Sequence, residues 1–261
     1  MARGSVSAVE AGLWGLPALA GTPALLMAPA GADDFVFRFV ELPAQPGFRA
    51  FRQHGWHAAE LIVDRVDPLA ERLRSSPFEI VAPPLDLTFA PDIRAMQIRG
   101  PGGEILYLTE FKRPVAGLAS PPARCTVDRT FIVIVGGASL TAMQDYYQRT
   151  FGVPVTPAME SRVQTMALEF GLSREHRFRL AALPLRERCY IEADEMPAAA
   201  APLPGTLTEL PSGIAMVTFA TAGAVEPAHP VPAMTPPYAG ARGVSLLRGA
   251  AGELIEVVHT A

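Results

Sequence analysis

The spacing of apolar residues predicts two surface helices. Around 67–76 and around 139–150, apolar side chains recur every three or four residues, which places them on one side of a helix. Such a helix covers a face of a sheet with its apolar side. Asp64 and Ser139 precede the two segments, and each side chain can accept a hydrogen bond from a free backbone N–H at a helix start.

Short apolar runs at 93–98 and 104–109 predict two strands. The segment between them contains Gly-Pro-Gly-Gly at 100–103, which is typical of a hairpin turn, so we expect the strands to pair antiparallel. Because this glycine-rich segment joins two strands, it does not have the context of a phosphate-binding loop. The sequence also has no Gly-x-Ser-x-Gly nucleophile elbow.

The chain repeats itself in the order A, B, A′, B′. Three pairs of segments match: 14–43 with 170–192, 55–63 with 213–221, and 100–107 with 249–256. Such self-similarity indicates a duplicated supersecondary unit. We interpret a complete unit as a strand, a helix and three further strands. Unit A shows no counterpart of the strand and helix at 129–152, so it is expected to be shortened. Unit B′ has Glu226, Pro227, Pro230 and Pro232 in place of a helix, which we expect to be lost.

Composition indicates a globular, cytoplasmic protein. With 261 residues and 49% hydrophobic content, the chain is long enough to bury one or two cores. No stretch approaches the roughly 20 apolar residues of a membrane helix. Glu10 and Gly12 interrupt the N-terminal apolar segment, so no signal peptide is expected.

Charge and cysteine content exclude several functions. The formal net charge is -4, and the sequence has no block of basic residues, which argues against nucleic-acid binding. Cys125 and Cys189 lie far apart and neither belongs to a Cys-x-x-Cys pair. They therefore suggest neither a disulfide framework nor a thiolate metal site.

Three strings carry a family resemblance: Gly-Trp-His-Ala-Ala-Glu-Leu-Ile-Val-Asp-Arg-Val-Asp from 55, Gln-Asp-Tyr-Tyr-Gln-Arg-Thr-Phe-Gly from 144, and Gly-Pro-Gly-Gly-Glu-Ile-Leu-Tyr from 100. In their order and duplication they resemble the vicinal oxygen chelate superfamily, which includes glyoxalase I, extradiol dioxygenases, and fosfomycin and bleomycin resistance proteins. The resemblance spans about 14–259. It implies an α+β fold in which tandem βαβββ modules form open, incomplete barrels. We expect one such domain at 1–115, a linker at 116–127 and a second domain at 128–261.

The resemblance also implies a divalent metal bound by the first and last strands of each module. The first-strand positions fall on Ala58, on Met216 and near Thr130 or Ile132, and the last-strand positions fall on Tyr107 and Glu256. Among these, Glu256 alone is a suitable ligand, whereas a catalytic metal needs about three protein ligands. We therefore expect no cofactor. A rearranged metal site remains an alternative, with His57, Glu110 and His259 as reserve ligands beside Glu256.

Two carboxylates and a phenol are the candidates for catalysis. Strand alternation places Glu256 between Leu254 and Val258, where partial desolvation raises a carboxyl pKa and suits the group to proton transfer. Glu60 shares a strand face with apolar neighbours, and we expect it to line the cleft. The alternative is that it forms an ion pair with an arginine. The Tyr107 hydroxyl can donate to a substrate carbonyl or simply pack.

The leading functional hypothesis is a metal-independent isomerase or lyase that acts by proton transfer on a small carbonyl-containing or aromatic compound. A non-catalytic binding or sequestration protein is the second hypothesis, and a metal-dependent glyoxalase or dioxygenase is the third. A missing strand in unit A would leave a sheet edge unpaired, so we expect a homodimer. The candidate ligand contacts are Trp14, Trp56, Met96, Met216 and Thr218.

Overall fold

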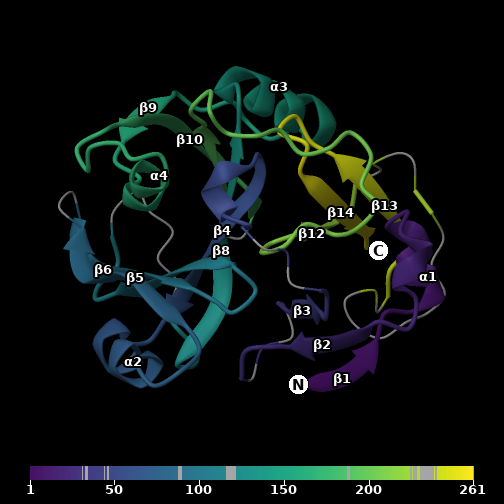
Figure 1. Cartoon of the computed structure of the whole chain (residues 1–261), viewed down its shortest axis with the longest axis horizontal. Helices are drawn as coiled ribbons and strands as arrows, with labels where there is room; N and C mark the ends of the chain where they lie inside the picture. Colours follow the sequence, from purple (N-terminus) through teal and green to yellow (C-terminus); the bar gives the residue numbers. More distant parts are fainter. Residues whose placement is uncertain are drawn as a thin grey trace.

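The computed structural model describes residues 1–30, 32, 35–43, 45, 47–87, 90–115, 122–186, 189–223, 225, 228–229, 238 and 240–260. Its largest sheet has eight strands and curls into an open half-barrel (Figure 1). In spatial order these strands are β5 (Glu79–Leu87), β6 (Ala90–Arg99), β7 (Ile105–Phe111), β4 (Gly55–Val63), β8 (Val127–Gly137), β11 (Tyr190–Glu195), β10 (Phe178–Pro184) and β9 (Met159–Ser161).

Two smaller sheets come from the first and last units of the repeat. One contains β1 (Ala2–Ser5), β2 (Pro23–Met27) and β3 (Phe37–Val40), and the other has the order β12 (Met216–Thr221), β14 (Leu254–His259) and β13 (Gly243–Arg248). The helices are α1 (Ala8–Leu13), α2 (Val66–Leu73), α3 (Leu140–Phe151) and α4 (Gln164–Glu169), with short 3₁₀ turns at Pro17–Leu19 and Ala50–Arg52. No helix in the described ranges has the length and apolar character that crossing a membrane requires.

The two complete units follow the expected βαβββ order. Unit B is β4-α2-β5-β6-β7 and unit A′ is β8-α3-β9-β10-β11, and antiparallel pairing of β4 with β8 joins them into one sheet. The predicted hairpin is confirmed, because β6 and β7 pair antiparallel on either side of the glycine-rich turn. These elements confirm the expected α+β fold.

Both predicted helices are present, but the predicted N-terminal cap is confirmed for α3 and wrong for α2. Ser139 accepts a hydrogen bond from the backbone of Ala142, as expected, and Gly152 ends α3 in the left-handed conformation at φ 67°. Asp64, in contrast, is not the cap of α2. The helix begins at Val66, whose N–H donates 2.9 Å to the side chain of Glu110 on β7. A residue from a neighbouring strand thus replaces the local cap.

The expectation that unit A lacks a strand and a helix is wrong: β1 and α1, of four and six residues, precede its hairpin, and β1 pairs with β2. The missing strand from which a homodimer was expected is thus present. Elements this short do not span the window in which hydrophobic periodicity can be recognised. The positions in unit B′ where a helix was expected to be lost, Glu226, Pro227, Pro230 and Pro232, lie outside the described residues.

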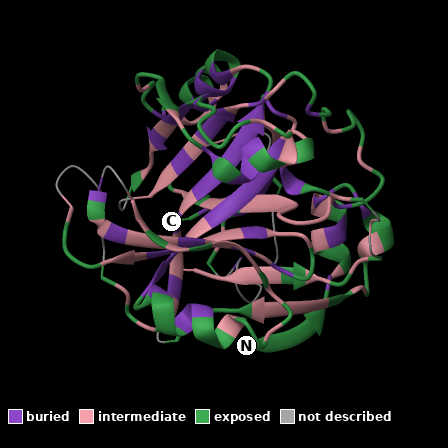
Figure 2. Cartoon of the chain, turned by 60° about the vertical axis from the view of Figure 1, so that its left-hand side comes forward, coloured by how far each residue is buried: buried purple, intermediate pink, exposed green. Residues whose placement is uncertain are grey.

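The eight-stranded sheet separates two apolar layers. On its outer face, Ala59 and Leu61 of β4 pack with Leu69 of α2, and the apolar side of α3 packs in the same way against β8 and β11. On the inner face, which carries Ala58 and Glu60, α4 packs through Met166. Buried residues accordingly concentrate along the strands (Figure 2).

Candidate functional site

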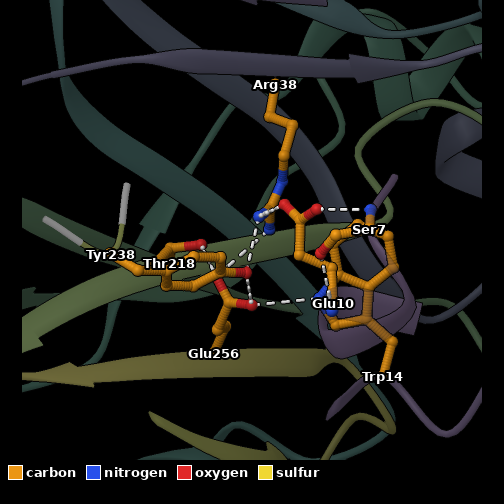
Figure 3. A network of polar contacts seen from close by, with 7 residues as sticks. All are labelled: Ser7, Glu10, Trp14, Arg38, Thr218, Tyr238 and Glu256. Carbon is orange, nitrogen blue, oxygen red and sulfur yellow. Dashed lines mark hydrogen bonds and ion pairs between the residues drawn. The ribbon is translucent and has the colours of Figure 1, made fainter. Parts of the chain in front are cut away.

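Glu256 is fully buried in a network of side-chain donors (Figure 3). Its Oε1 accepts hydrogen bonds from Trp14 Nε1 at 3.0 Å and from the Tyr238 hydroxyl at 2.7 Å. Its Oε2 accepts from the Thr218 hydroxyl at 2.7 Å and forms an ion pair of 3.1 Å with Arg38. Both oxygens are therefore occupied by protein groups.

Arg38 of β3 organises the same network. Its guanidinium donates 2.6 Å to the Tyr238 hydroxyl, lies 4.6 Å from the centre of the Trp14 ring, and pairs at 3.3 Å with Glu10 of α1. Burial is the largest single influence on the pKa of Arg38 and lowers it, but Glu256, Tyr238 and Glu10 together outweigh burial and raise the pKa overall. The ion pair joins the first unit of the chain to the last.

This network changes the expectation for three predicted site residues. Glu256 is a fully buried, ion-paired carboxylate, whereas alternation predicted a partly exposed one in a cleft. Trp14 and Thr218 donate to Glu256. Local alternation could not reveal Arg38, because it lies 218 residues from Glu256 in the chain.

A second group of polar residues crosses the inner face of the half-barrel. Glu60 is the register partner of Tyr107 on β7 and of Ile132 on β8, and Ile132 is in turn the partner of Tyr190 on β11. Directly paired residues of neighbouring strands point to the same face of a sheet. The row Tyr107, Glu60, Ile132, Tyr190 therefore lies side by side across four strands, and all four residues keep partial exposure.

Two acidic residues that were not among the predicted site residues complete this face. Glu192 follows Tyr190 at a spacing of two on β11 and therefore shares its face, and Asp194 follows at the same spacing. Glu192 is the last residue of the repeat segment 170–192. It was not identified as a last-strand ligand position, because that position is counted from a turn glycine and unit A′ has no glycine in the turn before β11. Spacing of two from Tyr190 was the signal that could have identified both residues.

Burial dominates the electrostatics of this group. It raises the pKa of Glu60 from 4.5 to about 7, although a 2.6 Å hydrogen bond from the Thr109 hydroxyl opposes the shift. It also raises the pKa of Glu192, with a further increase from the charges of Asp194 and Glu60. The pKa of the Tyr107 phenol is raised by burial and then by these acids, so the hydroxyl stays protonated and can donate.

Asp194 is the most confined member of the group. Its side chain is 0% exposed and neither carboxyl oxygen has a hydrogen-bond partner in the described part of the chain. Burial raises its pKa. Its register partner is Gly136, and an added Cβ there would lie 2.6 Å from His57 Nδ1. His57 therefore occupies the space over Gly136, which is the neighbour of Asp194 on the adjacent strand.

The reserve metal ligands lie at separate places. His57 is displaced by a bulge in β4, is buried, and contacts the carbonyl of Gln53 through Nε2 at 2.8 Å. Burial lowers the pKa of His57 to about 4. Glu110 caps α2, and His259 bonds to Ser245 at 2.8 Å. The structure does not bring these residues together.

The remaining predicted ligand contacts are core residues. Trp56 packs in the layer beneath α3 and donates 2.7 Å to the carbonyl of Leu254. Met96 packs with α2 on the outer face, away from Glu60. Met216 packs against the apolar cluster that contains Trp14.

A pocket of about 280 Å³ opens beside the row of inner-face residues. Thr165 of α4 lines it, and the Thr165 hydroxyl lies 3.1 Å from the Tyr107 hydroxyl. Its other lining residues combine apolar side chains with ion-paired charged ones: Phe51, Ile80, Val81, Ile105 and Leu168, with Arg49, Arg99, Glu79 and Glu169. The residues of the inner-face row do not line this pocket, and Thr165 connects it to Tyr107.

The residues of the inner face do not fit a divalent metal. Glu60, Glu192 and Asp194 influence one another electrostatically, yet no group of three His, Cys, Asp or Glu side chains within the described ranges has a geometry that could hold a metal ion. The inner-face positions next to them carry Tyr107, Ala58 and Ile132, which are poor ligands for such an ion. We therefore derive no step of the chemistry through a metal.

Comparison with known proteins identifies the fold. No family model matches the chain, and no curated protein matches its sequence. Solved structures do match. The V278E mutant of glyoxalase I from Zea mays has a TM-score of 0.55 at 14% identity, covering 91% of this chain and 78% of that one. A protein of Bacillus subtilis provisionally assigned as a dioxygenase has a TM-score of 0.54 at 12% identity, covering 92% and 73%.

Both matches extend over most of this chain. The protein therefore shares the fold of these glyoxalase I and dioxygenase structures, and this is the fold that the resemblance in its sequence implied.

Proposed function

We propose that this protein binds a small molecule on the inner face of the half-barrel and catalyses proton transfer there, as an isomerase or a lyase. The observation that carries the proposal is the position of Glu60: partly exposed, next to Tyr107, and with a pKa raised to about 7. A carboxyl group with a pKa near the working pH can both remove and return a proton.

The proposed chemistry balances within the site. Ionised Glu60 removes a proton from a carbon next to the substrate carbonyl, and the electron pair moves to the carbonyl oxygen. The Tyr107 hydroxyl, or protonated Glu192, donates a hydrogen bond or its proton to that oxygen. The electron pair then moves back from the oxygen, which returns any proton it received to Tyr107 or Glu192. If Glu60 gives its proton to a different carbon of the conjugated system, the product is an isomer. If the returning electron pair instead expels a leaving group from the neighbouring carbon, that group departs with the bonding pair and takes the proton from Glu60, and the product is that of a lyase.

Glu256 is left out of this chemistry because its oxygens already accept from Trp14, Tyr238, Thr218 and Arg38. Thr109 is assigned as a positioning residue for Glu60 instead. It is fully buried and directs its hydroxyl to the Glu60 carboxylate.

Deuterium exchange detects proton abstraction even while the natural substrate is unidentified. Small carbonyl compounds are incubated with the protein in deuterium oxide, and proton NMR follows loss of the signal next to the carbonyl. We expect exchange with the wild type, and a loss of about 100-fold or more in Glu60→Gln. The matched control is Glu71→Gln, which changes an exposed glutamate on α2. Equal exchange by Glu60→Gln and wild type would remove Glu60 from the mechanism.

A second candidate is ligand binding without chemistry. It is favoured by the pocket beside Tyr107, whose apolar lining includes Phe51, Ile80, Ile105 and Leu168. Tight binding of a compound that shows no exchange and no conversion, together with an undiminished affinity in Glu60→Gln, would select this function over catalysis.

A further inference from the structure

The inner face carries acidic groups that the protein itself does not neutralise. Four carboxyl side chains in the described ranges are fully buried: Asp128, Asp194, Glu253 and Glu256. Asp128 is paired with Arg124, Glu256 with Arg38, and Glu253 accepts from the Tyr147 hydroxyl and a backbone N–H. Asp194 has neither a cation nor a hydrogen-bond donor in the described part of the chain.

Glu60 and Glu192 share this lack of a cation. The one side-chain donor to Glu60 is the neutral hydroxyl of Thr109, and neither glutamate forms an ion pair with an arginine or lysine of the described chain. His57 occupies the space over Gly136, the register partner of Asp194, and burial keeps this histidine neutral at physiological pH. Three acids therefore meet on one face with no basic residue of the described ranges to balance them.

Two aromatic rings flank these acids. Tyr107 and Tyr190 lie at the ends of the row that contains Glu60, and Glu192 follows Tyr190 on the same face of β11. A tyrosine ring attracts a cation to its face, and a carboxylate attracts it by charge. Side chains of these two kinds form a surface suited to an ammonium group.

We propose that the ligand of this site is an organic cation, whose ammonium group lies between Glu60 and Glu192 and against the rings of Tyr107 and Tyr190. The proposal rests on the inner face being the ligand site, as proposed above. Fully buried Asp194 lies behind Glu192 and adds negative potential without direct contact. The rest of the molecule occupies the pocket lined by Thr165, Ile105 and Leu168.

Binding of a cation at this site depends on pH. The titratable groups that face the site are Glu60 from β4, Tyr107 from β7, Tyr190, Glu192 and Asp194 from β11, and His57 from the bulge of β4. Because burial raises the carboxyl pKa values, a bound cation must displace protons from these groups. Affinity for a permanently charged cation therefore rises as pH increases through about 7.

Isothermal titration calorimetry with matched probes tests the proposal. Choline is a permanent cation, and 3,3-dimethylbutan-1-ol has the same shape without the charge. Tetramethylammonium and benzyltrimethylammonium extend the cation series to smaller and larger sizes. We expect at least one cation to bind about tenfold or more tighter at pH 8 than at pH 6, and choline to bind better than its neutral analogue.

Isosteric variants locate the binding. Glu60→Gln and Glu192→Gln each remove one charge and are expected to weaken cation binding about tenfold, while Glu71→Gln leaves it unchanged. Urea unfolding of each variant establishes that it is folded. Equal affinity for the neutral analogue, the absence of binding by all three cations, or binding that is indifferent to both substitutions would overturn the proposal.

The outcome separates this proposal from the proposed catalysis. Cation binding without deuterium exchange supports the ligand class and removes the proton transfer. Exchange in neutral or anionic carbonyl compounds, with no cation bound, supports the proton transfer and excludes organic cations as the ligand class.

Discussion

The indole nitrogen of Trp14 donates a hydrogen bond of 3.0 Å to Glu256, so the helix α1 near the start of the chain is tied to β14 near its end. Arg38 supplies the charge that balances Glu256 in this buried position. Removing one partner of a buried ion pair leaves the other uncompensated, which costs about 3–5 kcal/mol.

Arg38→Met is therefore expected to lower the free energy of unfolding by about 3 kcal/mol, measured by urea denaturation at pH 7. The matched control is Arg74→Met, which breaks an exposed pair with Glu71 and should cost less than about 1 kcal/mol. If the two substitutions cost the same, the pair of Arg38 with Glu256 does not stabilise the fold.

The stability of the protein should depend on the charge of Glu60. The pKa of Glu60 is higher in the folded protein, about 7, than its usual value of 4.5, so the folded state binds more protons between these pH values. The free energy of unfolding therefore falls as pH rises through this window, by about 1–3 kcal/mol from this group.

Glu60→Gln removes that contribution, so the variant should gain stability relative to wild type on going from pH 5 to pH 8. Urea unfolding at both pH values gives the comparison, in which the titrating groups that do not interact with Glu60 cancel. A constant difference between the two proteins would show that the pKa of Glu60 is not raised. Glu71→Gln, on the exposed surface of α2, should show no such trend.

Thr109→Val tests the positioning of Glu60. The substitution keeps the buried shape and removes the 2.6 Å hydrogen bond that holds the pKa of Glu60 down. Hydrogen bonds to charged groups contribute about 1.5–3 kcal/mol, so the pKa should rise by about 1–2. Carbon-13 NMR titration of the glutamate carboxyl signals measures it. Thr165→Val, which affects Tyr107 instead, should leave the pKa of Glu60 in place.

Gly136→Ala should destabilise the fold by overpacking. The added Cβ would lie 2.6 Å from His57 Nδ1 and 2.7 Å from Met196 Sδ, both in a buried layer. Overpacking of this kind costs about 1–3 kcal/mol, which thermal or urea unfolding would detect. Gly12→Ala provides the contrast, because nothing lies within 4 Å of its added Cβ in α1 and alanine favours the helix. A neutral Gly136→Ala would mean that His57 can move away.

Local features of this protein followed from its sequence. The cap of α3 at Ser139 and the hairpin of β6 and β7 depend on side-chain periodicity and turn residues within short segments. The order of the repeats further predicted the superfamily fold. These properties are encoded by neighbours in the chain, which is why they can be read without tertiary structure.

The composition of both polar clusters was decided by strand pairing between distant segments. β8 lies between β4 and β11 and brings Glu192 and Asp194 to the face of Glu60, while the small sheets place Arg38 against Glu256. Which strands become neighbours depends on burying both faces of a sheet at once, against helices and loops from elsewhere in the chain. The sequence by itself determined the modules and their candidate residues. The tertiary structure decided that Glu256 is neutralised by an arginine and that Glu60 is not.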